Sequence, residues 1–158
     1  AVAPGFIAAE VAIGAAKMAM DAVYDSTVGL VTHVTEAGSA LYDLSLKTGA
    51  SVEGLSKLKY ISGQTGIEMG SFTTSMFMLQ RNLGATGEAG EKVRQSVKNI
   101  GLDFADLRRQ SPDQALIAVS AALGHVGDNA KIAHESTQLI GRGARTMAGL
   151  FHEGNALA

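Results

Sequence analysis

The chain has 158 residues and a net charge of −2, which is enough sequence for one domain with a hydrophobic core. Alanine (25 residues) and glycine (19) are abundant, whereas aromatic residues make up 5% and tryptophan is absent, so an aromatic-rich core is excluded. Nucleic-acid-binding proteins usually carry a basic excess that this chain lacks, so we expect no sequence-specific nucleic-acid partner. Because there is no cysteine, disulfide bonds, thiolate metal sites and cysteine catalysis are excluded.

The N-terminal region is apolar but carries no clear targeting signal. The chain begins at Ala1 rather than at methionine, so we expect it to be a fragment of a longer protein. Glu10 and Lys17 interrupt the apolar residues 1–20, and no charged region precedes them, so we predict no signal peptide. No uninterrupted apolar run of about 18–20 residues occurs, which argues against a transmembrane helix.

Apolar residues recur with a 3.5-residue period through residues 4–48. The two core positions of the heptads hold eleven apolar residues and the small Thr27: Phe6, Ala9, Ile13, Ala16, Met20, Val23, Thr27, Leu30, Val34, Ala37, Leu41 and Leu44. This period is typical of a coiled coil. Residues 28–35 are β-branched enough to suggest a strand, but the periodicity favours a helix. We therefore predict a long amphipathic, coiled-coil-like helix over residues 1–48.

The largest apolar residues of this helix form a predicted oligomerisation seam. Its members are Phe6, Ile13, Met20, Val23, Leu30, Val34, Leu41 and Leu44. Exposing so much apolar surface would cost several kcal/mol at ~25 cal/mol per Å², so the seam should be buried against sister copies or against a surrounding wall of another protein. The alternative is a long amphipathic helix that packs on its own domain, and the sequence leaves both open.

Residues 49–158 are predicted to form a second region, a compact bundle of short helices, which makes the fold all-α. Gly49 ends the long helix, and Ser51 can cap the next one, which carries Leu55, Leu58 and Ile61. Residues 63–70 are predicted to be a loop. A further helix places Phe72, Met76, Leu79 and Leu83 on one face and ends at Gly84.

Capping signals continue through the second half of the chain. Residues 88–100 are predicted to be a helix that ends at Gly101, and Asp103 can cap a short turn with Phe104 and Leu107. Residues 111–114 (Ser-Pro-Asp-Gln) have the pattern of a capping box with proline at the first helical position. Asp128 can cap another helix, which Gly141 and Gly143 end. These predicted helices bury the following residues: Leu116, Val119, Ala122 and Leu123, then Ile132 and Leu139, and in a last helix Met147, Leu150 and Phe151.

No residue pattern indicates a catalytic, cofactor or metal site, so we expect neither an enzyme nor a cofactor. The four histidines lie at least nine residues apart, unlike the close pairs typical of helical zinc sites: His33, His125, His134 and His152. Four glutamates in predicted first turns or loops favour helix dipoles over catalysis: Glu53, Glu68, Glu88 and Glu91. Two basic pairs are more typical of a solvated surface than of a DNA contact: Lys57 with Lys59, and Arg108 with Arg109. Three methionines fit core filling better than a partner groove: Met69, Met76 and Met78.

Four segments in order resemble the core region of phage tail tape measure proteins, the minor tail protein family. They are residues 46–60, 78–83, 100–116 and 139–144, with Leu150 and Phe151 closing the last one. The resemblance covers residues 44–154, about two thirds of the chain. In two places the sequence departs from the family pattern. Ile140-Gly141 stands where the family usually has Phe-Gly, and Gly127-Asp128-Asn129 replaces a proline with acidic residues.

The resemblance implies a structural virion component that lies in the tail tube lumen or at the tail tip. Such proteins form homo-oligomers, here a suspected trimer, contact the tail tube protein and the tail-tip or baseplate hub proteins, set tail length and leave ahead of the DNA. A helix is a suitable ruler because each residue adds ~1.5 Å. One alternative is a membrane-active or channel-forming segment of the delivery apparatus, in which residues 1–40 insert into the host membrane as an amphipathic or pore-lining helix during genome delivery. A less favoured alternative is a cell-wall hydrolase.

Overall fold

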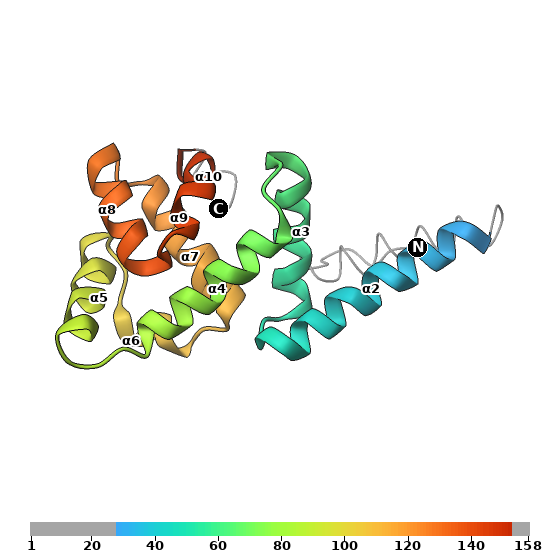
Figure 1. Cartoon of the computed structure of the whole chain (residues 1–158), viewed down its shortest axis with the longest axis horizontal. Coiled ribbons are helices and arrows are strands. Elements are labelled where there is room, and N and C mark those ends of the chain that lie inside the picture. The colour runs from blue at the N-terminus through green and yellow to red at the C-terminus, as the bar shows by residue number, and fades with distance from the viewer. Residues whose placement is uncertain (1–27, 153–158) are drawn as a thin grey trace, which may run out of the picture. The chain divides into compact units, whose positions relative to one another are not determined.

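The computed structural model describes residues 28–152 of the chain (Figure 1) and the side chains of residues 36–151. Every regular element in this range is a helix, which confirms the predicted all-α class. The helices are α2 (Val28–Thr48), α3 (Val52–Thr65), α4 (Met69–Leu83), α5 (Gly87–Asn99), α6 (Phe104–Arg109), α7 (Pro112–Gly124), α8 (Asn129–Ile140), α9 (Gly143–Thr146) and α10 (Ala148–His152).

The chain divides into two compact units, residues 1–60 and residues 61–158. The division falls within α3, whereas the sequence placed the boundary between residues 48 and 49, where α2 ends. Because α3 is one continuous helix, it belongs to both units.

Helix α2 accounts for the last 21 residues of the helix predicted over residues 1–48; residues 1–27 lie outside the described part of the chain. Residues 28–35 are helical, so periodicity outweighs their β-branched composition. The helix ends as predicted at Gly49, which has a positive φ of 72° that favours glycine. At the end of the helix, Thr48 Oγ1 donates to the carbonyl of Leu44 at 2.7 Å, and the backbone N–H of Ala50 donates to Thr48 Oγ1 at 3.2 Å.

Helix α3 begins at the predicted cap, because the backbone N–H of Gly54 donates to Ser51 Oγ at 2.9 Å. The loop predicted over residues 63–70 is wrong at both ends, since α3 continues to Thr65 and α4 already starts at Met69. Only Gly66, with a φ of 73°, has the backbone conformation of a stop signal. Gly63 and Gly70 are helical, at a cost of ~1 kcal/mol each relative to alanine.

Helix α4 is the centre of the second unit. It packs against α5, α7, α8 and α9, which gather around it together with α6 and α10 (Figure 1). The predicted face is buried: Phe72, Met76, Leu79 and Leu83 are all at most 2% exposed. The other helices complete the core with Val93, Val97, Leu107, Leu116, Val119, Leu123, Ile132, Leu139, Ile140, Met147, Leu150 and Phe151. Ala122, predicted to be buried, is half-buried.

Side-chain caps fix the starts of three helices. Asp103 Oδ1 accepts from the N–H of Asp106 at 2.8 Å, and Asp128 Oδ1 accepts from the N–H of Ala130 at 2.9 Å. At α7 the Gln114 side chain accepts from the backbone N–H of Ser111 at 3.4 Å, with Pro112 at the first helical position. These caps agree with the sequence because each needs only residues within one turn of each other.

The C-terminal part of the second unit differs from the single final helix predicted for it. Two short helices, α9 and α10, are separated at Met147, whose φ of −92° and ψ of 1° depart from helical geometry. Met147, Leu150 and Phe151 are nevertheless buried as predicted. The interruption therefore changes the path of the backbone but not the contribution of these residues to the core.

Candidate interaction surfaces

The predicted seam lies mostly in the part of the chain that the structure does not describe. Four of its residues fall outside the described range: Phe6, Ile13, Met20 and Val23. Leu30 and Val34 lie on α2, but their side chains are outside the described part. Leu41 and Leu44 are half-buried and share one stripe of α2 with Ala37 and Thr48, at spacings of four and three residues. The seam therefore stays a prediction.

The opposite side of α2 carries two exposed apolar side chains that the heptad pattern did not select. Tyr42 is 57% exposed and Leu46 is 69% exposed, and they lie four residues apart on one helical face. Asp43, which is exposed, borders this pair. Their place outside the heptad core positions was the signal that could have identified a second face.

The two basic pairs lie on solvated helix surfaces, and part of their charge is paired. Lys57 Nζ lies 3.4 Å from Glu53 Oε1, one turn earlier on α3. Arg109 pairs with Asp106 on α6. Exposed pairs of this kind contribute at most about 1 kcal/mol each.

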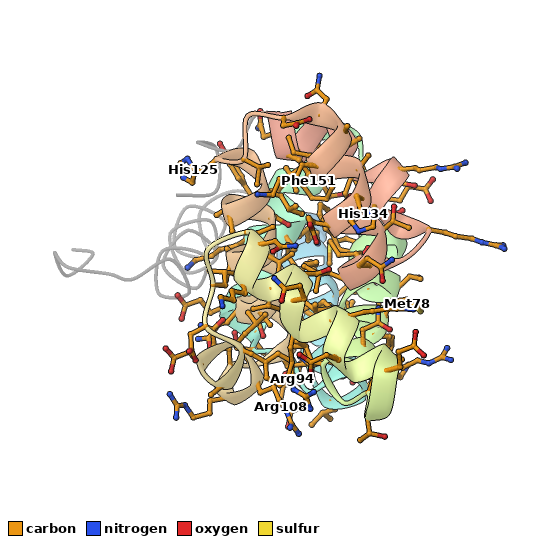
Figure 2. All side chains as sticks on the ribbon, turned by 90° about the vertical axis from the view of Figure 1, so that its left-hand side faces the viewer. Met78, Arg94, Arg108, His125, His134 and Phe151 are labelled. Atoms are coloured by element: carbon orange, nitrogen blue, oxygen red, sulfur yellow. The ribbon has the colours of Figure 1, made fainter. Side chains whose placement is uncertain are left out.

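Arg108 and Arg94 share one aromatic ring at the corner between α5 and α6. Their guanidinium carbons lie 5.9 and 5.5 Å from the centroid of Phe104, a geometry of cation–π attraction, and Figure 2 shows both side chains at this corner. Arg94 also pairs with the exposed Glu91 at 3.1 Å. The contact of Arg94 with Phe104 holds α6 against α5, and spacing along the sequence could indicate only the Arg108 contact, which lies within one turn of α6.

The three methionines divide between the core and its edge. Met76 is buried, whereas Met69 and Met78 are half-buried. Met78 lies where α4 passes the turn between α8 and α9 (Figure 2), and a Cβ built on Gly141 would come within 3.0 Å of its Cε. Core filling is therefore confirmed for Met76, and Met78 packs on a glycine.

Two polar side chains join helices of the second unit. Asn82 Nδ2 on α4 donates to the last carbonyls of α8, at 2.8 Å to Leu139 and 3.2 Å to Gln138. Asn99 Nδ2 on α5 donates at 2.9 Å to Oε1 of Glu135, a carboxylate only 3% exposed. Both contacts connect residues far apart in sequence, and sequence reasoning missed them because no local pattern marks them.

Within residues 36–151, no group of histidine and acidic side chains is arranged to hold a metal ion. His125 and His134 are both exposed (Figure 2), while the side chains of His33 and His152 lie outside the described part. Among the glutamates, Glu53 and Glu88 lie in first helical turns, as expected. None of the helices in the described part has the length and apolar character needed to cross a bilayer.

Comparison of the chain with protein-family models, with curated proteins and with solved structures finds no match.

Proposed function

We propose that this chain is part of a phage tail tape measure protein, a structural virion component that sets tail length inside the tail tube and is ejected at genome delivery. The observation that carries the proposal is the resemblance of four segments, in order, to the core region of that family. Its proposed partners are sister copies, the tail tube protein and the hub proteins at the tail tip.

The positions of these segments in the fold support the proposal. The second segment, residues 78–83, contains Asn82, and the fourth, residues 139–144, contains Leu139, whose carbonyl accepts from Asn82 at 2.8 Å. Gly141 of the fourth segment also packs on Met78 of the second. Two segments nearly 60 residues apart in the sequence thus contact each other. Because the contact needs residues from both segments, it is a physical reason for the two to occur together.

The remaining segments lie at helix boundaries, which supports the same reading. Residues 46–60 include the end of α2 and the cap of α3, and residues 100–116 run from the end of α5 through α6 into α7. Caps and glycine stops at these places fix where each helix begins and ends.

In this proposal residues 1–48 form one continuous helix, of which α2 is the described part. The seam residues of three copies bury one another. Each residue of the helix adds ~1.5 Å to the length that the protein spans in the tail. Two described seam residues, Leu41 and Leu44, are half-buried on one stripe of α2, which is compatible with a stripe that sister copies complete.

A direct test of the proposal is the location of the protein in infected cells. We expect mass spectrometry of purified tailed particles to detect peptides from residues 61–152 at a constant ratio to the tail tube protein. Particles from a virus with the gene disrupted should lack tails and these peptides, whereas capsid proteins remain. Recovery of the protein only from the host cytosol, and never from particles or tail assemblies, would contradict the proposal.

A further inference from the structure

The solvent-exposed side of α4 carries a row of residues whose spacing is symmetric about its own centre. Gly70, Thr74, Phe77 and Arg81 are all exposed and follow one another at intervals of four, three and four residues. This spacing places them on one face of the helix, opposite its buried face. The intervals read the same in both directions, and their midpoint lies between Thr74 and Phe77. We call these four residues the α4 stripe.

The two halves of the α4 stripe differ in shape. Phe77 places an aromatic ring, 54% exposed, in the C-terminal half. The N-terminal half has only the small Thr74 and Gly70, and a Cβ built on Gly70 would meet nothing within 4 Å, so the surface there is open. A bulky ring in one half and open space in the other make the stripe complementary to an inverted copy of itself.

Charges of opposite sign lie at the two ends of α4. Arg81 is in the last turn of the helix, and Glu68 is the residue directly before its first turn. Both are exposed, and the ion pairs found within the described residues are all formed by other side chains. The side chain of Glu68 makes no capping hydrogen bond to α4. An inverted second copy of α4 would therefore present a carboxylate where this copy presents a guanidinium.

A two-fold axis through the midpoint of the α4 stripe defines which residues of two antiparallel copies face each other. Phe77 of each copy lies opposite Thr74 of the other, and Arg81 lies opposite Gly70, which leaves room for the long arginine side chain. Glu68 is two residues beyond Gly70, a rise of only ~3 Å along a helix, so Arg81 can reach it. Burial of the two rings removes apolar surface from water, while the two ion pairs set the orientation.

We propose that α4 of one copy packs antiparallel on α4 of a second copy through the α4 stripe, with an ion pair between Arg81 and Glu68 at each end. The contact is isologous, because the same surface serves on both copies, and it therefore closes as a dimer. All of its residues lie between Glu68 and Arg81 in the second unit, so it is distinct from the seam predicted in residues 1–48. The proposal does not depend on the tape measure function.

A charge-swap experiment on the 158-residue chain tests the contact. Sedimentation velocity at rising protein concentration should show an association step that weakens between 50 and 500 mM NaCl. Glu68→Arg and Arg81→Glu should each raise the dissociation constant of this step by about tenfold or more, because each variant alone forms a like-charge pair at both ends of the dimer. An equimolar mixture of the two variants should restore association, because the mixed dimer has an opposite-charge pair at both ends.

Cross-linking locates the contact on α4. The chain has no cysteine, so Thr74→Cys introduces a single thiol close to the proposed two-fold axis. A short bis-maleimide should join two copies of this variant. Thr137→Cys, which also replaces an exposed threonine but on α8, is the matched control and should give little cross-linked dimer. This test uses an otherwise wild-type chain, so it stands even if a charge variant fails to fold.

Matched variants separate this contact from others. Lys98→Glu reverses the charge of an exposed residue on α5 and should leave the association step unchanged. Phe77→Ser changes no charge and should weaken both the association step and the cross-link at Thr74→Cys. Leu41→Lys should reduce the predicted seam oligomer but leave that cross-link in place. Far-UV circular dichroism verifies the fold of every variant.

Three outcomes would overturn the proposal. One is failure of the mixed charge variants to restore association while both are folded. Another is a Thr74→Cys chain that cross-links no better than the Thr137→Cys control, which would leave the α4 stripe to another part of the same chain or to a different protein. A third is self-association that neither Phe77→Ser nor the charge variants change, which would assign it to the seam alone.

Discussion

Replacing Phe72 by alanine is expected to lower the free energy of unfolding by about 3–5 kcal/mol. The ring is 0% exposed on α4, the helix against which four others of the second unit pack. Truncation removes the buried ring from the apolar interior and leaves a cavity that the surrounding helices can fill only in part. Urea unfolding followed by circular dichroism measures the change as a lower midpoint at an unchanged slope.

Phe77→Ala is the matched control, because it removes the same side chain from the same helix five residues later. Phe77 is 54% exposed, so its loss should change the stability of the monomer by no more than about 0.5 kcal/mol. Equal destabilisation by the two variants, measured at a concentration where the protein is monomeric, would show that the two faces of α4 are assigned wrongly.

Replacing Gly90 by alanine is expected to destabilise the protein by about 1–3 kcal/mol. Gly90 is a buried residue near the start of α5, and a Cβ there would lie 2.3 Å from the carbonyl oxygen of Ala85 and 2.8 Å from its carbon. Both atoms are backbone, so the collision is relieved only by moving the turn between α4 and α5. This strain should exceed the ~1 kcal/mol that alanine gains over glycine in a helix.

Gly63→Ala makes the same chemical change with the opposite expected sign. Gly63 is helical in α3, and a Cβ there meets nothing within 4 Å. Alanine should therefore raise the free energy of unfolding by up to about 1 kcal/mol. Thermal unfolding of the two variants side by side measures the difference, and a Gly90→Ala variant as stable as Gly63→Ala would contradict the close approach at α5.

The parts of the fold that the sequence predicted are those set by neighbouring residues. Asp103 and Asp128 cap their helices because the acceptor and the N–H groups lie within one turn. Three glycines that were predicted to end helices have positive φ angles, as expected of stop signals. Gly49 and Gly141 directly follow α2 and α8, and Gly101 lies two residues after the end of α5. Gly63 and Gly70 also suggested a loop, but both are helical and neither has a positive φ angle. The loop between α3 and α4 was therefore predicted too long.

The surfaces were less predictable because they depend on which helices meet. Asn82 is an ordinary helical residue in sequence, and only the approach of α8 gives its amide a partner. Arg94 reaches the ring of Phe104, which Arg108 also contacts from one turn later on α6, only because α5 approaches α6. The heptad pattern selected the half-buried stripe of Leu41 and Leu44. The place of Tyr42 and Leu46 outside its core positions was a signal for a second, exposed face that the prediction did not use.

We propose that the helical length of this protein sets the length of a tail, and a change in that length tests the proposal. Duplicating residues 28–48 in the viral gene, directly after Thr48, adds 21 residues and keeps the heptad register, since three heptads are inserted. The added helix has a length of about 32 Å at ~1.5 Å per residue. A matched insertion of 21 glycine and serine residues at Gly127, in the connection between α7 and α8, adds the same chain length without a helix.

Electron microscopy of the tails in the two viruses is the decisive measurement. We predict that mean tail length increases by about 30 Å with the helical duplication and is unchanged with the insertion at Gly127. Tails of wild-type length in the virus with the duplicated helix, with the altered protein present in the particles, would contradict the claim that this chain is part of the ruler.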